Sequence, residues 1–187
     1  MLIIQSCYKP DEEWAPNVSE ICERTGSTCG FIERSYTYAG RGRHYYNQYC
    51  AKSVADVCKM IKCAKPAPFS EIIVYGHCGG PELGAENPGI SFGTGKPRFD
   101  ATSLNVKCFL AIEQALAKDG VLTLCSCGYR PASPDDAKKW DQSLQEMANY
   151  LGRTVCACPG VSNLSADEGC ICVGGAKPVC KSPEKEK

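Results

Sequence analysis

An excess of charge and a long apolar run are both missing from this sequence, and each absence excludes a class of partner. The chain carries 21 Lys and Arg against 21 Asp and Glu, so it has no basic excess to neutralise nucleic-acid phosphates or anionic lipid heads. No apolar run approaches the roughly 20 residues of a membrane-spanning helix. The opening MLIIQSC also lacks the charged start and the long apolar middle of a signal peptide. We therefore expect neither a nucleic-acid partner nor a membrane span, and no visible leader for export.

Cysteine, in contrast, is abundant, with 15 in 187 residues. Small secreted domains carry many disulfides because they bury too little apolar surface to fold without them. A chain of this length with 43% hydrophobic residues can bury its own core, so its cysteines need a further explanation. The candidates are disulfides for an oxidising environment, thiolate ligands for a metal, and catalysis. Because 15 is odd, at least one thiol stays unpaired even if all the others bridge.

The hydrophobic pattern alternates between short apolar runs, typical of buried parallel strands, and amphipathic segments, typical of helices. The expected strands are Met1–Cys7, Glu71–Gly76, Val121–Cys125 and Thr154–Cys158, with Ile90–Phe92 as a further short candidate. The expected helices are Ser53–Cys63, Leu104–Ala117 and Asp135–Leu151. Ser53 is the expected N-cap of the first helix, Asp119-Gly120 the expected end of the second and Gly152 that of the third.

This alternation predicts a single α/β domain over residues 1–180, with a mostly parallel sheet and helices on both of its faces. The segment Ile171–Cys180 is expected to form a cysteine-rich hairpin around Gly174-Gly175. Residues 181–187 are expected to form a disordered tail.

Two expected strands end in chemically reactive residues. The strand Glu71–Gly76 runs directly into His77, and the strand Val121–Cys125 runs into Ser126 and Cys127. The carboxyl ends of parallel strands meet at one edge of a sheet, so neighbouring strands in register would bring an imidazole and a thiol together. A thiolate that attacks and an imidazole that carries the proton are what nucleophilic catalysis by sulfur requires.

The residues that carry this pattern, EIIVYGHCGG followed by LTLCSCG, resemble the caspase-like superfamily of cysteine peptidases. The His-to-Cys separation, 127 − 77 = 50, equals the spacing of about 50 known for caspases. The stretch from LTLCSCGYR to LGRTVCACPGVSN is also similar to a caspase-like domain of large bacterial surface proteins. The likeness covers roughly residues 70–163.

The resemblance implies a cysteine endopeptidase that cleaves a protein or peptide through a thioester, without a cofactor. Matched position by position, His77 is the catalytic histidine, Cys127 the nucleophile and Ser126 the small residue before it. The family's oxyanion hole implies that the backbone amides of Cys127 and of the Cys78–Gly79 turn meet the oxyanion. The chain departs from the family at this turn, because Cys78 stands where the family has glycine and Gly79 comes one place later. The size and the cysteine content suit a secreted toxin or effector domain. Three arginines are candidates for a pocket that selects an acidic side chain: Arg41, Arg43 and Arg130.

The same residues are compatible with functions other than catalysis. His77 and Cys127 are also compatible with a structural histidine and half a disulfide, which would make the chain an inactive, disulfide-stapled binding module. Cys125 lies two residues before Cys127 and is a candidate redox partner or a competitor for the role of nucleophile. Three C-x-C pairs suggest a thiolate metal site, although zinc sites prefer wider gaps and the chain has no C-x-x-C: Cys125/Cys127, Cys156/Cys158 and Cys170/Cys172. Candidate local disulfide partners, with their connectivity left open, are Cys22/Cys29 and Cys50/Cys58/Cys63. His44, the second histidine, lies in an aromatic stretch.

Overall fold

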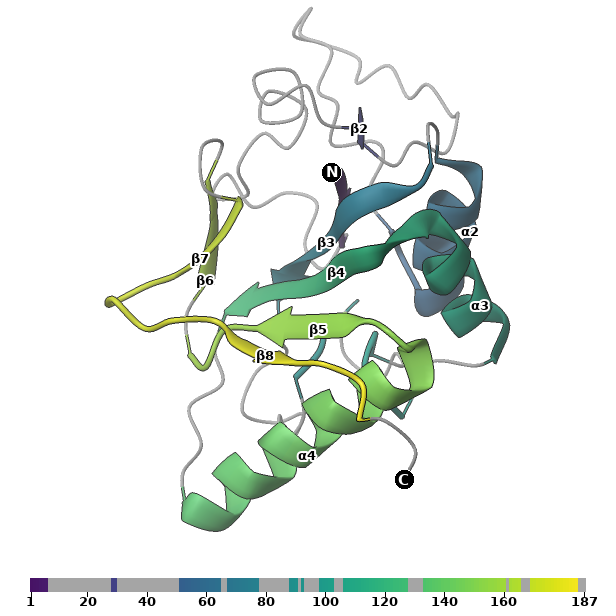
Figure 1. The fold of residues 1–187 in the computed structure, drawn as a ribbon. Helices are drawn as coiled ribbons and strands as arrows, with labels where there is room; N and C mark the ends of the chain where they lie inside the picture. The colour runs from purple at the N-terminus through teal and green to yellow at the C-terminus, as the bar shows by residue number, and fades with distance from the viewer. Residues whose placement is uncertain are drawn as a thin grey trace, which may run out of the picture.

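A computed structural model describes residues 1–6, 28–29, 51–64, 67–77, 88–90, 92, 98–102, 106–127, 133–160, 162–165 and 169–184. Its main feature is a sheet of six strands in the order β2-β1-β3-β4-β5-β8 (Figure 1). The strands are β1 (Leu2–Gln5), β2 (Thr28–Cys29), β3 (Phe69–His77), β4 (Leu116–Cys127), β5 (Thr154–Ala157) and β8 (Val179–Lys181). All pairs from β2 to β5 are parallel, and β8 pairs with β5 antiparallel. The expected α/β fold with a mostly parallel sheet is confirmed.

Three described helices connect these strands: α2 (Val54–Cys63), α3 (Val106–Ala115) and α4 (Pro134–Leu151). The Ser53 hydroxyl accepts a hydrogen bond from the amide of Asp56 at 3.2 Å, and so caps α2 as expected. Ser133 caps α4 in the same way, through the amide of Asp136 at 3.1 Å. Gly152 ends α4 in the left-handed conformation, with φ of 63°, which glycine adopts without a steric cost.

The described helices all pack on one face of the sheet, so the prediction of helices on both faces is wrong for this part of the chain. Alternate strand residues such as Ile72, Val74, Leu122 and Leu124 share one buried cluster with side chains from α2, α3 and α4, among them Trp140. The strand order explains this arrangement. From β2 to β5, each described crossover leads in the same direction across the sheet, and right-handed crossovers in one direction put their helices on the same face.

The opposite face is covered by a separate antiparallel hairpin of β6 (Ser162–Ser165) and β7 (Gly169–Cys172). Its Leu164 packs in a second buried cluster with Ile3, Ile73 and Tyr75. In Figure 1 the hairpin stands beside the arrowheads of β3 and β4, where these two strands end. Both faces of β3 are therefore buried in its middle, which accounts for the apolar run from Ile72 to Tyr75.

The cysteine-rich C-terminal segment does not form the expected hairpin around Gly174-Gly175. The strand before this turn, β7, pairs with β6, whereas the strand after it, β8, pairs with β5. Cys180 of β8 bonds to Cys156 of its partner strand β5, whereas Cys172 of β7 bonds to Cys158, the residue that follows β5. A turn signal predicts that the chain changes direction but not which strands then pair.

The end of α3 also differs from the prediction. The helix stops at Ala115, and β4 begins at the next residue. Between two register pairs, β3 advances from Phe69 to Glu71 while β4 advances from Leu116 to Val121. The extra residues of β4 include Asp119-Gly120, so the expected helix stop lies in an irregularity of the strand instead.

Residues 181–184, expected in a disordered tail, are instead bound to the domain. Lys181 is the last residue of β8, and its ammonium lies 2.7 Å from the Asp141 carboxylate on α4. The carbonyl of Ser182 accepts a hydrogen bond from Gln145 at 2.8 Å. The amide of Glu184 donates one to an α4 side chain at the same distance. The last three residues lie outside the described part of the chain.

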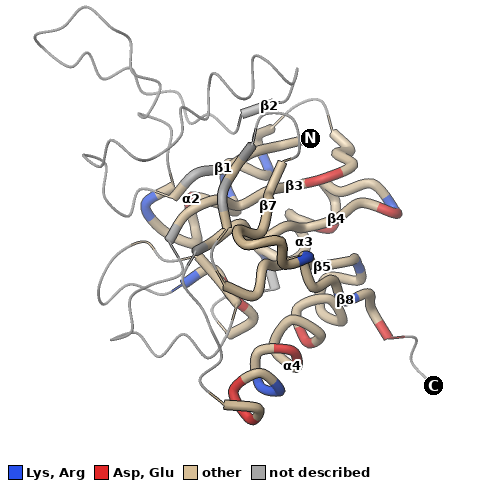
Figure 2. The backbone as a smooth tube through the Cα atoms, turned by 90° about the vertical axis from the view of Figure 1, so that its left-hand side faces the viewer, with Lys and Arg blue, Asp and Glu red and all other residues tan. Residues whose placement is uncertain are grey.

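Both charge signs occur along α4 in Figure 2, with Asp135 and Asp136 in its first turn and lysines soon after. Within the described ranges, no helix is long and apolar enough to cross a membrane.

The pair α2 and α3 is further joined by a disulfide between Cys58 and Cys108. The expected local partners of Cys58 are therefore wrong, because its sulfur is bonded 50 residues away.

Candidate functional site

The last paired residues of β3 and β4 are His77 and Cys127. The parallel register matches Gly76 with Ser126 and His77 with Cys127, without a shift over the preceding residues from Glu71 onward. Neighbouring strands in a sheet lie about 4.8 Å apart. The backbone therefore brings the two positions expected to react together at one edge of the sheet.

Gly76, directly before His77, is the point where three segments meet. The amide of Ser6, at the end of β1, donates to the Tyr75 carbonyl at 2.8 Å. A Cβ atom built on Gly76 would overlap the Ser6 hydroxyl and lie 2.9 Å from Ile90 Cγ2. Only glycine allows so close an approach, and the contact fixes the end of β3 against β1.

Ile90 belongs to a short pairing between β3 and α3 in the sequence. Its amide donates to the Phe99 carbonyl at 3.1 Å, and the Phe99 amide donates back at 2.9 Å. Both side chains and that of Phe92 are almost fully buried. The short strand expected at Ile90–Phe92 is thus present at Ile90 as an isolated bridge, packed against the end of β3.

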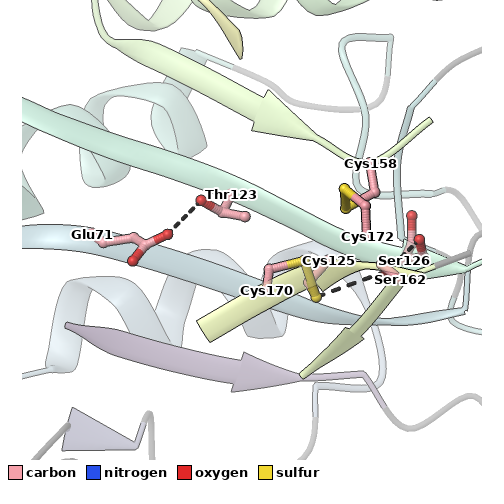
Figure 3. The surroundings of a disulfide bond; sticks show 8 residues. All are labelled: Glu71, Thr123, Cys125, Ser126, Cys158, Ser162, Cys170 and Cys172. Carbon is pink, nitrogen blue, oxygen red and sulfur yellow. Dashed lines mark hydrogen bonds between the residues drawn. A yellow bond between two sulfur atoms is a disulfide. The ribbon is translucent and has the colours of Figure 1, made fainter. Parts of the chain in front are cut away.

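Cys125 does not compete with Cys127 for the role of nucleophile in this structure. Its sulfur is bonded to Cys170 of β7, and the residue is fully buried. A disulfide sulfur has no thiolate form, so it neither attacks a carbonyl nor binds a metal as a thiolate. The bond joins β4 to the hairpin, as Figure 3 shows, and Cys125 precedes Cys127 by two residues.

A hydroxyl of the same hairpin reaches the strand end itself. Ser162 of β6 donates a hydrogen bond from its Oγ to the carbonyl oxygen of Ser126 at 2.5 Å. The same Oγ lies 3.8 Å from the Cys125 sulfur, and Ser162 is 7% exposed. Figure 3 shows this contact beside the two disulfides of the hairpin. No motif in the sequence identifies Ser162, because its role depends on a contact between distant segments.

A polar pair lies further back on the same two strands. The Thr123 hydroxyl donates to a carboxylate oxygen of Glu71 at 2.6 Å, across the β3–β4 pair (Figure 3). Thr123 is buried, so the bond satisfies a hydroxyl that would otherwise lack a partner in the sheet. The contact supports the register that matches His77 with Cys127.

The C-x-C pairs expected as metal ligands are used differently. Five of their six cysteines form disulfides, each with a cysteine of another pair or with Cys180: Cys125–Cys170, Cys156–Cys180 and Cys158–Cys172. Cys63, exposed at the end of α2, is a free cysteine of the described segments. Within those segments, no three His, Cys, Asp or Glu side chains gather in a way that could hold a metal ion.

Several expected site residues lie outside the described part of the chain. These are the oxyanion candidates Cys78 and Gly79, the pocket candidates Arg41, Arg43 and Arg130, and His44. The register of the His77 and Cys127 backbones is therefore the geometry that defines the candidate site.

Comparisons with protein-family models, with curated protein sequences and with solved structures give no significant match for this chain.

Proposed function

We propose that this chain is a cysteine-dependent acyl-transfer enzyme, an endopeptidase of the caspase-like kind, with Cys127 as nucleophile and His77 as general base. The observation that carries the proposal is the register that pairs these two positions at the ends of β3 and β4. Register partners on adjacent parallel strands project from the same face of a sheet, about 5 Å apart. That spacing suits a thiol and an imidazole that exchange a proton.

In the proposed reaction, His77 takes the thiol proton while the Cys127 sulfur attacks the carbonyl carbon of a peptide bond. Backbone amides of Cys127 and of the Cys78–Gly79 turn stabilise the negative oxygen of the tetrahedral intermediate. When the C–N bond breaks, the imidazolium gives its proton to the departing amine and a thioester remains. Water then attacks the thioester with His77 as base, and the thiol is restored. No cofactor is needed for these steps.

The strand order supports a site at this edge. The first five strands run 2-1-3-4-5, a doubly wound order in which the direction of winding changes between β1 and β3. In open parallel sheets, ligands bind outside the carboxyl ends of the strands near such a change. His77 is the last residue of β3, which borders this change, and Ser6, directly after β1, lies against Gly76.

Four disulfides among the described residues bear on where the enzyme would act. Disulfides persist in oxidising compartments and are rare in the cytosol. They support a secreted or delivered protein, as expected of a toxin or effector domain.

An electrophilic peptide probe tests the proposal. The unmodified protein is expected to react at Cys127, located by peptide mapping, and both Cys127→Ala and His77→Ala are expected to abolish the labelling. Cys63→Ala is the matched control, because it removes an exposed free thiol at the last residue of α2. This variant is expected to leave the labelling of Cys127 unchanged. Melting temperatures of all variants are compared, since loss of a buried thiol can also unfold a domain. A folded Cys127→Ala protein that cleaves peptides at the unmodified rate would refute the mechanism.

A second candidate function is a disulfide-stapled binding module without catalysis. The observation that favours it is the number of cysteines committed to cross-links, which stabilise a fold whether or not it reacts. In that case the probe would label Cys63 and Cys127 at similar, slow rates, and His77→Ala would change neither.

A further inference from the structure

The β6–β7 hairpin is joined to the main sheet beside the proposed site by two disulfides. Cys125–Cys170 ties it to β4, and Cys158–Cys172 ties it to the chain just after β5. Cys170 and Cys172 are two apart on β7, so both sulfurs leave the same face of that strand. We call these two disulfides the clamp (Figure 3).

Besides the clamp, the described part of the hairpin contacts the sheet through the Ser162 hydroxyl and the Leu164 side chain. Among its described side chains, Leu164 is the one apolar group that is nearly fully buried against the sheet. An isolated two-stranded hairpin is marginally stable at best in water. The position of β6 over the sheet therefore depends on the clamp.

The Ser162 hydroxyl connects the hairpin to the end of β4. It donates to the Ser126 carbonyl, and that carbonyl belongs to the same planar peptide group as the amide nitrogen of Cys127. Holding one end of a rigid peptide plane fixes the other end as well. The contact thus restrains the backbone from which the proposed nucleophile projects.

We infer that the hairpin positions Cys127 through Ser162 and that the site is active only while the clamp is oxidised. Ser162 is then a positioning residue. The inference rests on the proposed Cys127–His77 chemistry and adds its redox control. A dithiol reductant switches the site off: each clamp disulfide takes up two electrons and two protons and becomes two thiols, while the dithiol becomes a disulfide.

The test measures how fast iodoacetamide alkylates Cys127 at a series of pH values, with the site of reaction found by peptide mapping. A thiolate held beside an imidazolium forms at lower pH than the thiolate of an isolated cysteine, whose pKa is about 8.5. Ser162→Ala is expected to move the midpoint of the profile upward, and to slow labelling by the electrophilic peptide about 10- to 100-fold. Ser162→Thr keeps the hydroxyl and is expected to restore both. A purely structural serine would change the melting temperature and leave the midpoint in place.

The clamp is tested in parallel with paired substitutions. Cys158→Ala with Cys172→Ala removes one clamp bond and is expected to reproduce the effect of Ser162→Ala. Cys156→Ala with Cys180→Ala is the matched control, because it also removes one disulfide, but one that joins β5 to β8 and does not hold the hairpin. This control is expected to keep the unmodified pH midpoint.

The outcomes separate the two proposals. If unmodified Cys127 titrates as an ordinary thiol and the peptide probe does not label it, the proposed function fails and the inference falls with it. If unmodified Cys127 reacts at low pH, but neither Ser162→Ala nor the clamp variant changes the midpoint or the labelling rate, the function stands and the hairpin has no positioning role.

Discussion

Replacing Gly76 by alanine tests whether the close approach of β1 to β3 holds the site together. The added methyl group would overlap Ser6 Oγ and lie 2.9 Å from both Ser6 Cβ and Ile90 Cγ2. Real Cβ atoms do not come this close to other heavy atoms, so β1, Ile90 or the end of β3 must move. His77 is the next residue and moves with that end.

Overpacking of a buried site costs about 1–3 kcal/mol. Alanine in place of glycine returns about 0.4–1 kcal/mol, because the unfolded chain loses conformational freedom. The overlap with Ser6 Oγ is severe and puts the cost at the upper end of its range, so the expected net loss is about 2 kcal/mol, which lowers the melting temperature of a chain of this size by about 4–8 °C. The rate at which the peptide probe labels Cys127 is also expected to fall, and by more than the small rise in the unfolded fraction would explain.

The Ser6→Gly background isolates the cause. It removes both Ser6 atoms that the new methyl group would meet, so Gly76→Ala is expected to cost less than half as much there as in the unmodified chain. Thermal unfolding with the disulfides intact measures all four proteins of this cycle. Equal costs in the two backgrounds, or a Gly76→Ala protein as stable as the unmodified one, would contradict the close packing described here.

Three further substitutions test other parts of the fold by denaturant unfolding. Removing the α2–α3 disulfide with Cys58→Ala and Cys108→Ala is expected to lower the free energy of unfolding by about 4 kcal/mol, because the bond closes a 50-residue loop; an unchanged midpoint would contradict the link. Thr123→Val leaves the Glu71 carboxylate without its donor and is expected to cost about 1–3 kcal/mol, whereas Thr123→Ser keeps the hydroxyl and most of the stability. Trp140→Ala empties a buried site between α4 and the sheet and is expected to cost about 3–5 kcal/mol; a cost below 1 kcal/mol would mean that the indole is not in the core.

Local patterns in the sequence were sufficient for the central elements of the fold. Periodicity and caps located α2 and α4, because Ser53 and Gly152 act within their own helices. The apolar runs located β3 and β4, and their reactive ends are in register as the spacing suggested. Parallel strands joined by one helix have few alternative arrangements, so this part of the topology follows from local order.

What the sequence could not supply depends on contacts between distant segments. The helix face depends on the order of the strands, which no local pattern encodes. The partner of Cys125 depends on the hairpin lying over β4, and a C-x-C spacing suits a metal site, a redox pair and two disulfides equally well. Ser162 gave no signal for the same reason, since one serine among many gains a role only when β6 is placed beside Ser126.

The disulfides link the two sides of the turn after β7 independently of the peptide backbone of that turn. Residues 173–178 form an exposed turn between Cys172 and Cys180. A protease that cuts this turn would leave β7 bonded to β4 and β5, and β8 bonded to β5 through Cys156. The nicked protein would keep all its strands in one covalent unit and separate into two fragments only after reduction. In a protease-rich environment, cleavage at this turn would therefore leave the sheet edge with His77 and Cys127 attached to every strand around it.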